Sequence, residues 1–217
     1  NVLTLEDPIE YSIEGLTQVQ VGRKLSFANA LRATLRQDPD VILVGEVRDA
    51  ETADLCVKAA STGHLVLTTL HANGPKEVMD RFVQLGVDPR MLQSVLKFSS
   101  AQRLVKRLCP HCKLPASDIE RSFICDQLTE KSPPCQGAVG AEFFSRNAEG
   151  CARCMAGAIG RIPVLAYLKA KEIADHLNWT GEARIAEAQA GGSSLQESCL
   201  GLARKGEIDF HEIFQIS

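Results

Sequence analysis

Three short apolar runs in the first third of the chain have the pattern of buried parallel strands. Residues 2–5, 41–44 and 65–69 are rich in Val, Ile, Leu and Thr, and polar or acidic residues follow each run. Strands that are covered on both faces are apolar throughout, because neither face meets water. We therefore predict three buried strands, each of which leads into polar residues.

Helical spacing fills the stretches around these runs. Apolar residues recur at intervals of three and four over residues 26–37, and Pro39 ends that pattern. Asp49 is suited to cap a second helix after the second strand. Residues 76–108 have helical spacing again, with a break at 86–89. Strands that alternate with helices predict a doubly wound α/β sheet, whose ligands bind beyond the carboxyl ends of the strands.

The second half of the chain has a different pattern. A stretch without clear periodicity, residues 113–150, lies between two pairs of cysteines, and helical spacing returns over residues 164–217 with an interruption at 191–194. We therefore predict three parts, which are an α/β core at 1–108, a cysteine-stapled subdomain at 109–160 and a helical lobe at 161–217.

The paired cysteines predict a structural metal site. Two Cys-x-x-Cys knuckles are typical of zinc, and cysteines at this spacing rarely form structural disulfides, although disulfides and a redox pair remain alternatives. Zinc implies a reducing compartment. His111 is a competing ligand that the tight turn of its knuckle directs outward. Cys125 and Cys135 receive no assignment, and the four predicted ligands are Cys109, Cys112, Cys151 and Cys154.

Composition changes this picture only slightly. The 217 residues suffice for one sizeable core and a smaller lobe. With 24 Lys and Arg against 27 Asp and Glu, the net charge of −3 argues against a nucleic-acid-binding protein, because such proteins are usually basic. No apolar run approaches the ~20 residues that span a bilayer.

Carboxylates follow two of the predicted strands. Gly45 lets a ligand approach the backbone beside Glu46, and a carboxylate there can order an attacking water or bind magnesium. A surface glutamate is the alternative. Glu6, Asp7 and Glu10 form an acidic cluster, which needs a neutralising cation unless it is a solvated turn.

Cationic residues offer further candidates. Arg32 and Arg36 are four residues apart on a predicted helix, so their charges repel each other unless a phosphate or a nearby carboxylate bridges them. His64 and His71 lie at opposite ends of the third predicted strand. His71 is at the carboxyl end and is a candidate phosphate contact, whereas we expect His64 to pack or to hydrogen-bond locally.

One expected motif is absent from residues 1–217. No Gly-x-x-x-x-Gly-Lys-Ser/Thr occurs in them, and this loop is what holds nucleotide phosphates in P-loop proteins. The chain also begins inside an apolar run. We therefore expect the chain to be the downstream part of an ATPase, and we expect the 217 residues alone to be inactive.

The order of these segments resembles the type II secretion and type IV pilus assembly ATPases. The resemblance is carried by Glu-Asp-Pro-Ile-Glu-Tyr, Leu-Arg-Ala-Thr-Leu-Arg-Gln-Asp-Pro-Asp, Val-Gly-Glu-Val-Arg-Asp, Thr-Gly-His followed by Thr-Leu-His-Ala-Asn, and Gln-Arg-Leu-Val-Lys-Arg-Leu-Cys-Pro-His-Cys. These motifs cover residues 3–113, and the match resumes at 151–161. In that family the three sheet-associated motifs are called the Asp box, Walker B and His box. An acid that the family has near Ala166 is missing.

The resemblance implies a RecA-like P-loop ATPase core that is truncated at its N-terminus and that uses ATP and Mg²⁺. It assigns catalytic roles to Glu46, Glu6, Glu10 and His71. It also implies nucleotide or magnesium contacts by a larger group of residues, which are Asp7, Arg32, Arg36, Arg48, Arg81 and His64.

The resemblance also implies partners. The full-length protein would be a homo-hexamer in the cytoplasm, attached to an inner-membrane platform protein, and it would drive pilin or pseudopilin assembly without binding nucleic acid. The four cysteines belong to the assembly branch of the family rather than to the retraction ATPases. Two alternatives are a zinc-stapled interaction module with a decayed nucleotide site and a related conjugation or DNA-uptake ATPase.

Overall fold

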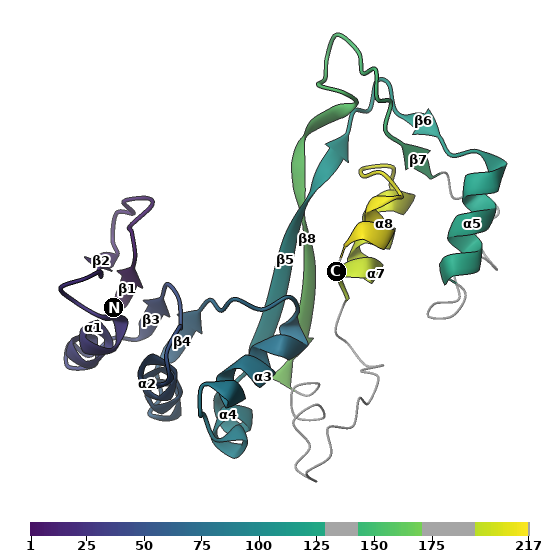
Figure 1. The fold of residues 1–217 in the computed structure, drawn as a ribbon. Coiled ribbons are helices and arrows are strands. Elements are labelled where there is room, and N and C mark those ends of the chain that lie inside the picture. The colour runs from purple at the N-terminus through teal and green to yellow at the C-terminus, as the bar shows by residue number, and fades with distance from the viewer. Residues whose placement is uncertain (129–142, 171–193, 217) are drawn as a thin grey trace. The chain divides into compact units, whose positions relative to one another are not determined.

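A computed structural model describes residues 1–128, 143–170 and 194–216. These residues form two compact units, each with its own apolar core. Of the described residues, the first unit holds 1–99 and 168–170, and the second holds 100–128, 143–167 and 194–216 (Figure 1). Within the described ranges, no helix is both long enough and apolar enough to cross a membrane.

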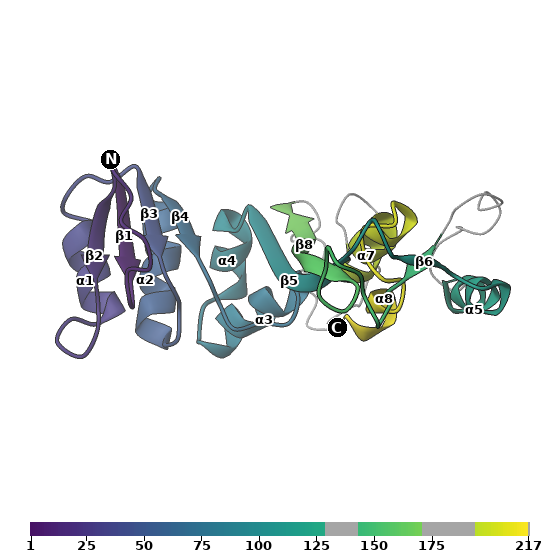
Figure 2. The same cartoon turned by 90° about the horizontal axis from the view of Figure 1, so that it is seen from above.

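The first unit is built on a four-stranded parallel sheet in the order β2-β1-β3-β4 (Figure 2). Its strands are β1 (Val2–Glu6), β2 (Thr17–Gln20), β3 (Val41–Val44) and β4 (Leu65–Thr68). The three predicted strands are therefore confirmed. The polar edge strand β2 was not predicted. Leu5 lies opposite Val44, and Val44 lies opposite Thr68, so the carboxyl ends of β1, β3 and β4 meet at one edge of the sheet.

The predicted helices of this unit are also present, with shifted ends. They are α1 (Phe27–Thr34), α2 (Ala50–Ser61), α3 (Pro75–Gln84) and α4 (Pro89–Val95). Helix α1 ends three residues before the predicted end at 37. The Asp49 carboxylate caps α2 as expected, because it accepts a hydrogen bond from the Thr52 amide at 2.8 Å. Helices α1 and α2 lie on the same side of the sheet (Figure 1).

The two faces of this sheet differ in burial. On the face toward α1 and α2, Leu5, Ile42 and Val44 are fully buried. On the opposite face, Leu65 and Leu67 are 56% and 48% exposed. Parallel sheets usually have both faces covered. Within the described residues, only one face of this sheet carries helices, so the doubly wound arrangement is seen in part.

The second unit contains two long strands where helices were predicted. Strands β5 (Phe98–Leu108) and β8 (Ala158–Lys169) pair with each other, so the helical predictions for residues 98–108 and 164–169 are wrong. Ala101, Val105 and Leu108 are spaced by four and three residues, which imitates one face of a helix, but Ser99, Ala101 and Val105 are buried with exposed residues between them. Helices α7 (Leu195–Arg204) and α8 (Glu212–Gln215) complete the core.

The stretch between the cysteine pairs is more ordered than predicted. Strands β6 (Leu114–Pro115) and β7 (Phe144–Ser145) pair in antiparallel fashion, and helix α5 (Asp118–Leu128) lies between them in sequence. Ile124 of α5 is fully buried in the second core. Cys125 belongs to α5, but its side chain lies outside the described residues, as does Cys135.

Candidate functional site

The backbone around Glu46 is held from both neighbouring strands. The Gly45 amide donates to the Leu5 carbonyl at 2.8 Å, and the Val47 amide donates to the Thr69 carbonyl at 3.1 Å. The Thr69 hydroxyl also donates to the Gly45 carbonyl at 2.5 Å. Glu46 is therefore fixed between two anchored residues at the carboxyl ends of the strands.

Gly45 is required by how closely these strands approach each other. A Cβ atom at this position would lie 2.9 Å from the Leu5 carbonyl oxygen, a distance that real Cβ atoms essentially never show. Any side chain here would push β1 and β3 apart. The Gly-Glu order of the motif thus places a carboxylate directly after a point of backbone contact.

One oxygen of the Glu46 carboxylate faces an arginine and the other faces a histidine. Arg48 Nη2 lies 2.6 Å from Glu46 Oε1, and His71 Nε2 lies 3.7 Å from Glu46 Oε2. The Glu46 side chain is only 16% exposed, whereas His71 is 87% exposed. The structure thus brings three of the predicted site residues together at one strand edge, with the carboxylate at the centre.

Glu6 lies on the adjacent strand at the same edge. Thr4 Oγ1 donates to Glu6 Oε1 at 2.5 Å, and Gln18 Nε2 donates to the same oxygen at 2.9 Å. These two hydrogen bonds stabilise the charged carboxylate and hold the pKa of Glu6 below its usual value. Oxygens of this kind are suitable ligands for a hard cation such as Mg²⁺.

The other two acids of this cluster are exposed. Asp7 and Glu10 follow Glu6 in the connection between β1 and β2, with both side chains open to solvent. No contact is recorded between either of them and Glu46. The structure therefore places Glu6 beside the Glu46 turn and leaves Asp7 and Glu10 on a neighbouring surface.

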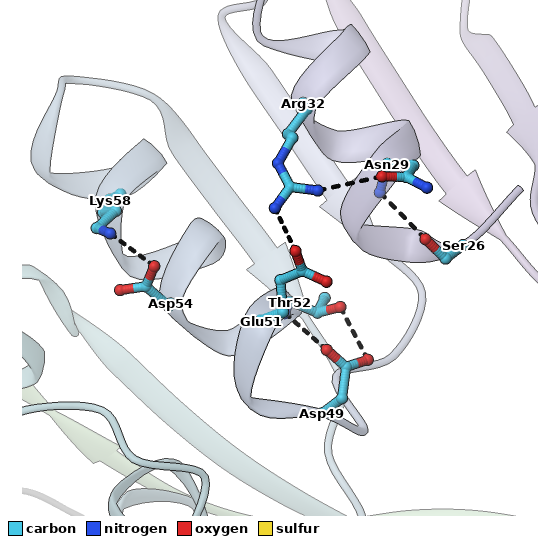
Figure 3. Close-up of polar contacts among 8 residues, drawn as sticks. All are labelled: Ser26, Asn29, Arg32, Asp49, Glu51, Thr52, Asp54 and Lys58. Atoms are coloured by element: carbon cyan, nitrogen blue, oxygen red, sulfur yellow. Dashed lines mark hydrogen bonds and ion pairs between the residues drawn. The ribbon is translucent and has the colours of Figure 1, made fainter.

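Arg32 is engaged in a contact that the sequence did not suggest (Figure 3). Its guanidinium forms an ion pair with Glu51, in the first turn of α2, and donates to Asn29 Oδ1 at 3.1 Å. The sequence left a phosphate or a nearby carboxylate as the possible partner of Arg32. In the structure, Arg32 instead links α1 to α2.

We expect Arg32→Ala to lower the free energy of unfolding of the chain by less than ~1 kcal/mol. Arg32 and Glu51 are 47% and 60% exposed, and exposed ion pairs contribute little to stability. Urea unfolding of the variant measures this directly, with Glu51→Ala as the matched partner. A loss of several kcal/mol would give Arg32 a structural role.

Arg36 and His64 lie near the amino ends of the strands, whereas Glu46 lies at their carboxyl ends. The Gln37 carbonyl, next to Arg36, accepts from Asn1 Nδ2 at 2.9 Å, and Asn1 immediately precedes β1. A five-residue strand such as β1 is about 15 Å long, and this length separates the amino ends of the strands from their carboxyl ends. His64 directly precedes β4, and its Nδ1 lies 2.9 Å from the Ala59 carbonyl of α2. The expected local hydrogen bond of His64 is therefore confirmed.

Arg81 belongs neither to the group around Glu46 nor to the pair formed by Arg36 and His64. It lies in α3 and donates to Gln84 Oε1 at 3.3 Å. Of the predicted cationic residues, only Arg48 and His71 contact Glu46 among the described residues.

The four paired cysteines meet in the second unit. Their sulfur atoms all lie within 4.8 Å of one another, with separations of 3.8 Å for Cys109–Cys151, 3.6 Å for Cys112–Cys154 and 3.7 Å for Cys151–Cys154. Four thiolates at ~2.3 Å from a tetrahedral metal would have their sulfurs ~3.8 Å apart. These cysteines therefore lie close enough together to hold a metal ion, and the spacing fits a closed tetrahedral site.

The surroundings shift the pKa values of two of these thiols in opposite directions. Burial raises the pKa of Cys154, but hydrogen bonds from the Cys151 amide and the Cys112 thiol outweigh it and bring the pKa to about 7. Burial and the neighbouring thiols raise the pKa of Cys112 to about 12. His111 is exposed, and its Nε2 lies 3.3 Å from Arg153 Nη1, outside the cluster.

Sequence reasoning missed the polar residues that support the two carboxylates. Thr69 was noted only as a strand end, and Thr4 and Gln18 were not singled out. Their roles depend on strand register, because Thr4 lies opposite Gln18 in the β1–β2 ladder. The alternation of polar residues in Thr-Gln-Val-Gln was the one available signal for β2.

Comparisons with known proteins agree with these observations. The sequence model of the family described as type II/IV secretion system protein matches residues 1–215. The chain is 55% identical over 115 residues to type II secretion system protein E of Klebsiella pneumoniae, which is 52% of this chain and 23% of that protein. It is 39% identical over 223 residues to the type IV pilus assembly ATPase PilB of Acinetobacter baylyi, which is 100% of this chain and 38% of that protein.

A solved structure is also similar. The pilus retraction motor PilT with bound ADP has a TM-score of 0.66 and 25% identity, and the match covers 100% of this chain and 52% of that one. The likeness supports the predicted α/β ATPase fold. The chain spans less than half the length of the two curated relatives and about half that of the solved motor.

Proposed function

This chain belongs to the family of type II/IV secretion system proteins, and we propose that it supplies the catalytic-carboxylate side of the nucleotide site in a longer ATPase. The observation that carries the proposal is the Glu46 turn. Two strands anchor this turn, and its little-exposed carboxylate lies between Arg48 and His71 at the carboxyl edge of a parallel sheet. Ligands of such sheets bind at that edge.

In the proposed mechanism, Glu46 orients the attacking water and accepts its proton. Glu6, Asp7 and Glu10 are the candidate carboxylates around the Mg²⁺ that accompanies ATP. The ion, when bound, neutralises charge on the phosphates. His71 and Arg48 provide hydrogen-bond donors next to Glu46, which suits them to contact the γ-phosphate side of the nucleotide.

The cations farther from Glu46 receive different proposals. Arg32 lies on α1 and is already paired with Glu51. Arg36 and His64 lie at the amino edge of the sheet, so they do not face the proposed site of the same chain. If the protein forms the proposed homo-hexamer, Arg36 can serve a neighbouring subunit. Arg81 on α3 stays a weaker candidate of the same kind.

We propose that zinc is the metal of the cysteine cluster and that its role is structural. The sulfur spacing and the purely thiolate ligand set support this choice. Four protein ligands complete a tetrahedral shell and leave no position for substrate. Zinc would hold the segment after β5 to the segment before β8 rather than take part in hydrolysis.

For the full-length protein we propose ATP-driven assembly of pilin or pseudopilin in a secretion or pilus machine. The names of the curated relatives and the four cysteines support assembly over retraction. In this proposal the protein is a cytoplasmic homo-hexamer that attaches to an inner-membrane platform protein. No observation favours a second function.

We expect the 217-residue chain alone neither to hydrolyse ATP nor to bind it with sub-micromolar affinity. Backbone amides and the lysine of a phosphate loop normally carry nucleotide affinity, and residues 1–217 do not include that motif. Calorimetry with Mg²⁺ and ATP measures this. Sub-micromolar binding would mean that the site is complete without a phosphate loop.

A further inference from the structure

Gln18 is bonded through every polar atom of its side chain. Its Nε2 donates to Glu6 Oε1 at 2.9 Å and to the Tyr11 carbonyl at 3.0 Å, and its Oε1 accepts from the Ile13 amide at 2.8 Å. One side chain on the edge strand β2 thus joins a strand-end carboxylate to two points of the following loop.

The geometry of the sheet explains why this position reaches both partners. Gln18 lies opposite Thr4 in the parallel β1–β2 ladder, and Glu6 follows Thr4 on the same face of β1. Thr4 is buried and donates to the same oxygen of Glu6. Glu6 Oε1 is therefore occupied by two donors, and Glu6 Oε2 has no recorded partner among the described residues.

The loop that Gln18 holds is otherwise exposed. Tyr11 and Ile13 are 80% and 52% exposed, and Glu10 is the residue next to Tyr11. A loop with so little buried surface has few other contacts to fix its conformation. Two hydrogen bonds, one donated by Gln18 to the Tyr11 carbonyl and one accepted from the Ile13 amide, tie this loop to the sheet.

We propose that Gln18 is a positioning residue for the site: it orients Glu6 and holds the loop that carries Glu10 at the same edge. The inference rests on the proposed function for its catalytic meaning. The hydrogen-bond pattern requires an amide, because the position must donate twice and accept once. A glutamate would keep the shape, lose both donors and place a second carboxylate against Glu6.

The first arm of the test uses the 217-residue chain and needs no activity. Amide hydrogen exchange followed by NMR should show the Ile13 amide exchanging at least tenfold faster in Gln18→Leu than in the wild-type chain. Gln20→Leu is the matched control, since Gln20 is an exposed residue of the same strand. Equal protection of Ile13 in Gln18→Leu and wild type would overturn the proposal.

The second arm measures ATP turnover in the full-length protein. We expect Gln18→Glu to lower kcat roughly tenfold or more, with a KM for ATP within a few-fold of wild type, because displacement of a catalytic group affects the chemical step most. Gln20→Glu is the charge control, since Gln20 lies opposite Glu6 in the ladder. Equal effects of the two variants would mean that the added negative charge alone lowers turnover, which would contradict the proposal.

The two experiments distinguish a failure of the proposed function from a failure of the positioning role of Gln18. A wild-type protein without ATP turnover would remove the proposed function, while the exchange result would still decide whether Gln18 holds the loop. An active wild type with a fully active Gln18→Glu variant would remove only the positioning role.

Discussion

Glu46→Gln is expected to lower ATP turnover by ~10²-fold or more in the full-length protein, with ATP binding retained. The amide has the shape of the carboxylate but cannot accept a proton from water, and a loss of this size corresponds to ~2.7 kcal/mol of transition-state stabilisation. The backbone should be unaffected, because Gly45, Val47 and Thr69 hold the turn without the Glu46 side chain. Phosphate release and ATP binding by calorimetry measure the two quantities separately.

A matched control is available on the neighbouring helix. Asp54 of α2 pairs with Lys58 on the surface, so Asp54→Asn makes the same change from carboxylate to amide away from Glu46 (Figure 3). We expect that variant to keep wild-type turnover. Wild-type turnover in Glu46→Gln would remove Glu46 from the mechanism.

Cys151→Ser is expected to abolish zinc binding and to loosen residues 109–128 and 143–160. The structure places Cys151 within 3.7 to 3.8 Å of two other sulfurs, so its loss breaks a tetrahedral shell. Structural zinc sites contribute folding free energy directly. Elemental analysis should give one zinc per wild-type chain and none in the variant, and hydrogen exchange should rise around β6 and β7.

The first unit should stay folded in this variant, because its core is separate from that of the second unit. Cys199→Ser is the control, since Cys199 is a buried free cysteine outside the cluster. Zinc affinity should also weaken as the pH falls, and more steeply below about 7, because protons then compete with the metal for the Cys154 thiolate as well. A Cys109–Cys112 disulfide in metal-free protein purified anaerobically would contradict the zinc assignment.

The sequence predicted much of the first unit because β1 and β3 are largely apolar and because side chains cap the start of α1 and α2. Apolar runs such as residues 41–44 are typical of buried parallel strands, and Asp49 marks the start of α2 because its carboxylate accepts the hydrogen bond that caps the helix. The carboxyl-edge position of Glu46 follows from the strand that precedes it. These features depend on local sequence alone.

The second unit was harder to predict because its strands imitate helices. In β5, small and polar residues such as Ser99 are buried, so hydrophobicity alone does not reveal the alternation of a strand. The partners of Glu6 and Glu46 were missed for a related reason. Thr4, Gln18 and Thr69 act across strands, and the register that brings them together is a property of the folded sheet.

We propose that the nucleotide binds at the carboxyl ends of strands β1, β3 and β4. The full-length protein with bound Mn²⁺ and ATP tests this most directly, because a paramagnetic ion broadens the NMR signals of nearby nuclei. His71 and His64 lie at opposite ends of β4 and serve as internal reporters once their imidazoles are labelled with carbon-13. We expect strong broadening of the His71 signal and little change at His64. Equal broadening of both signals, or stronger broadening at His64, would contradict it.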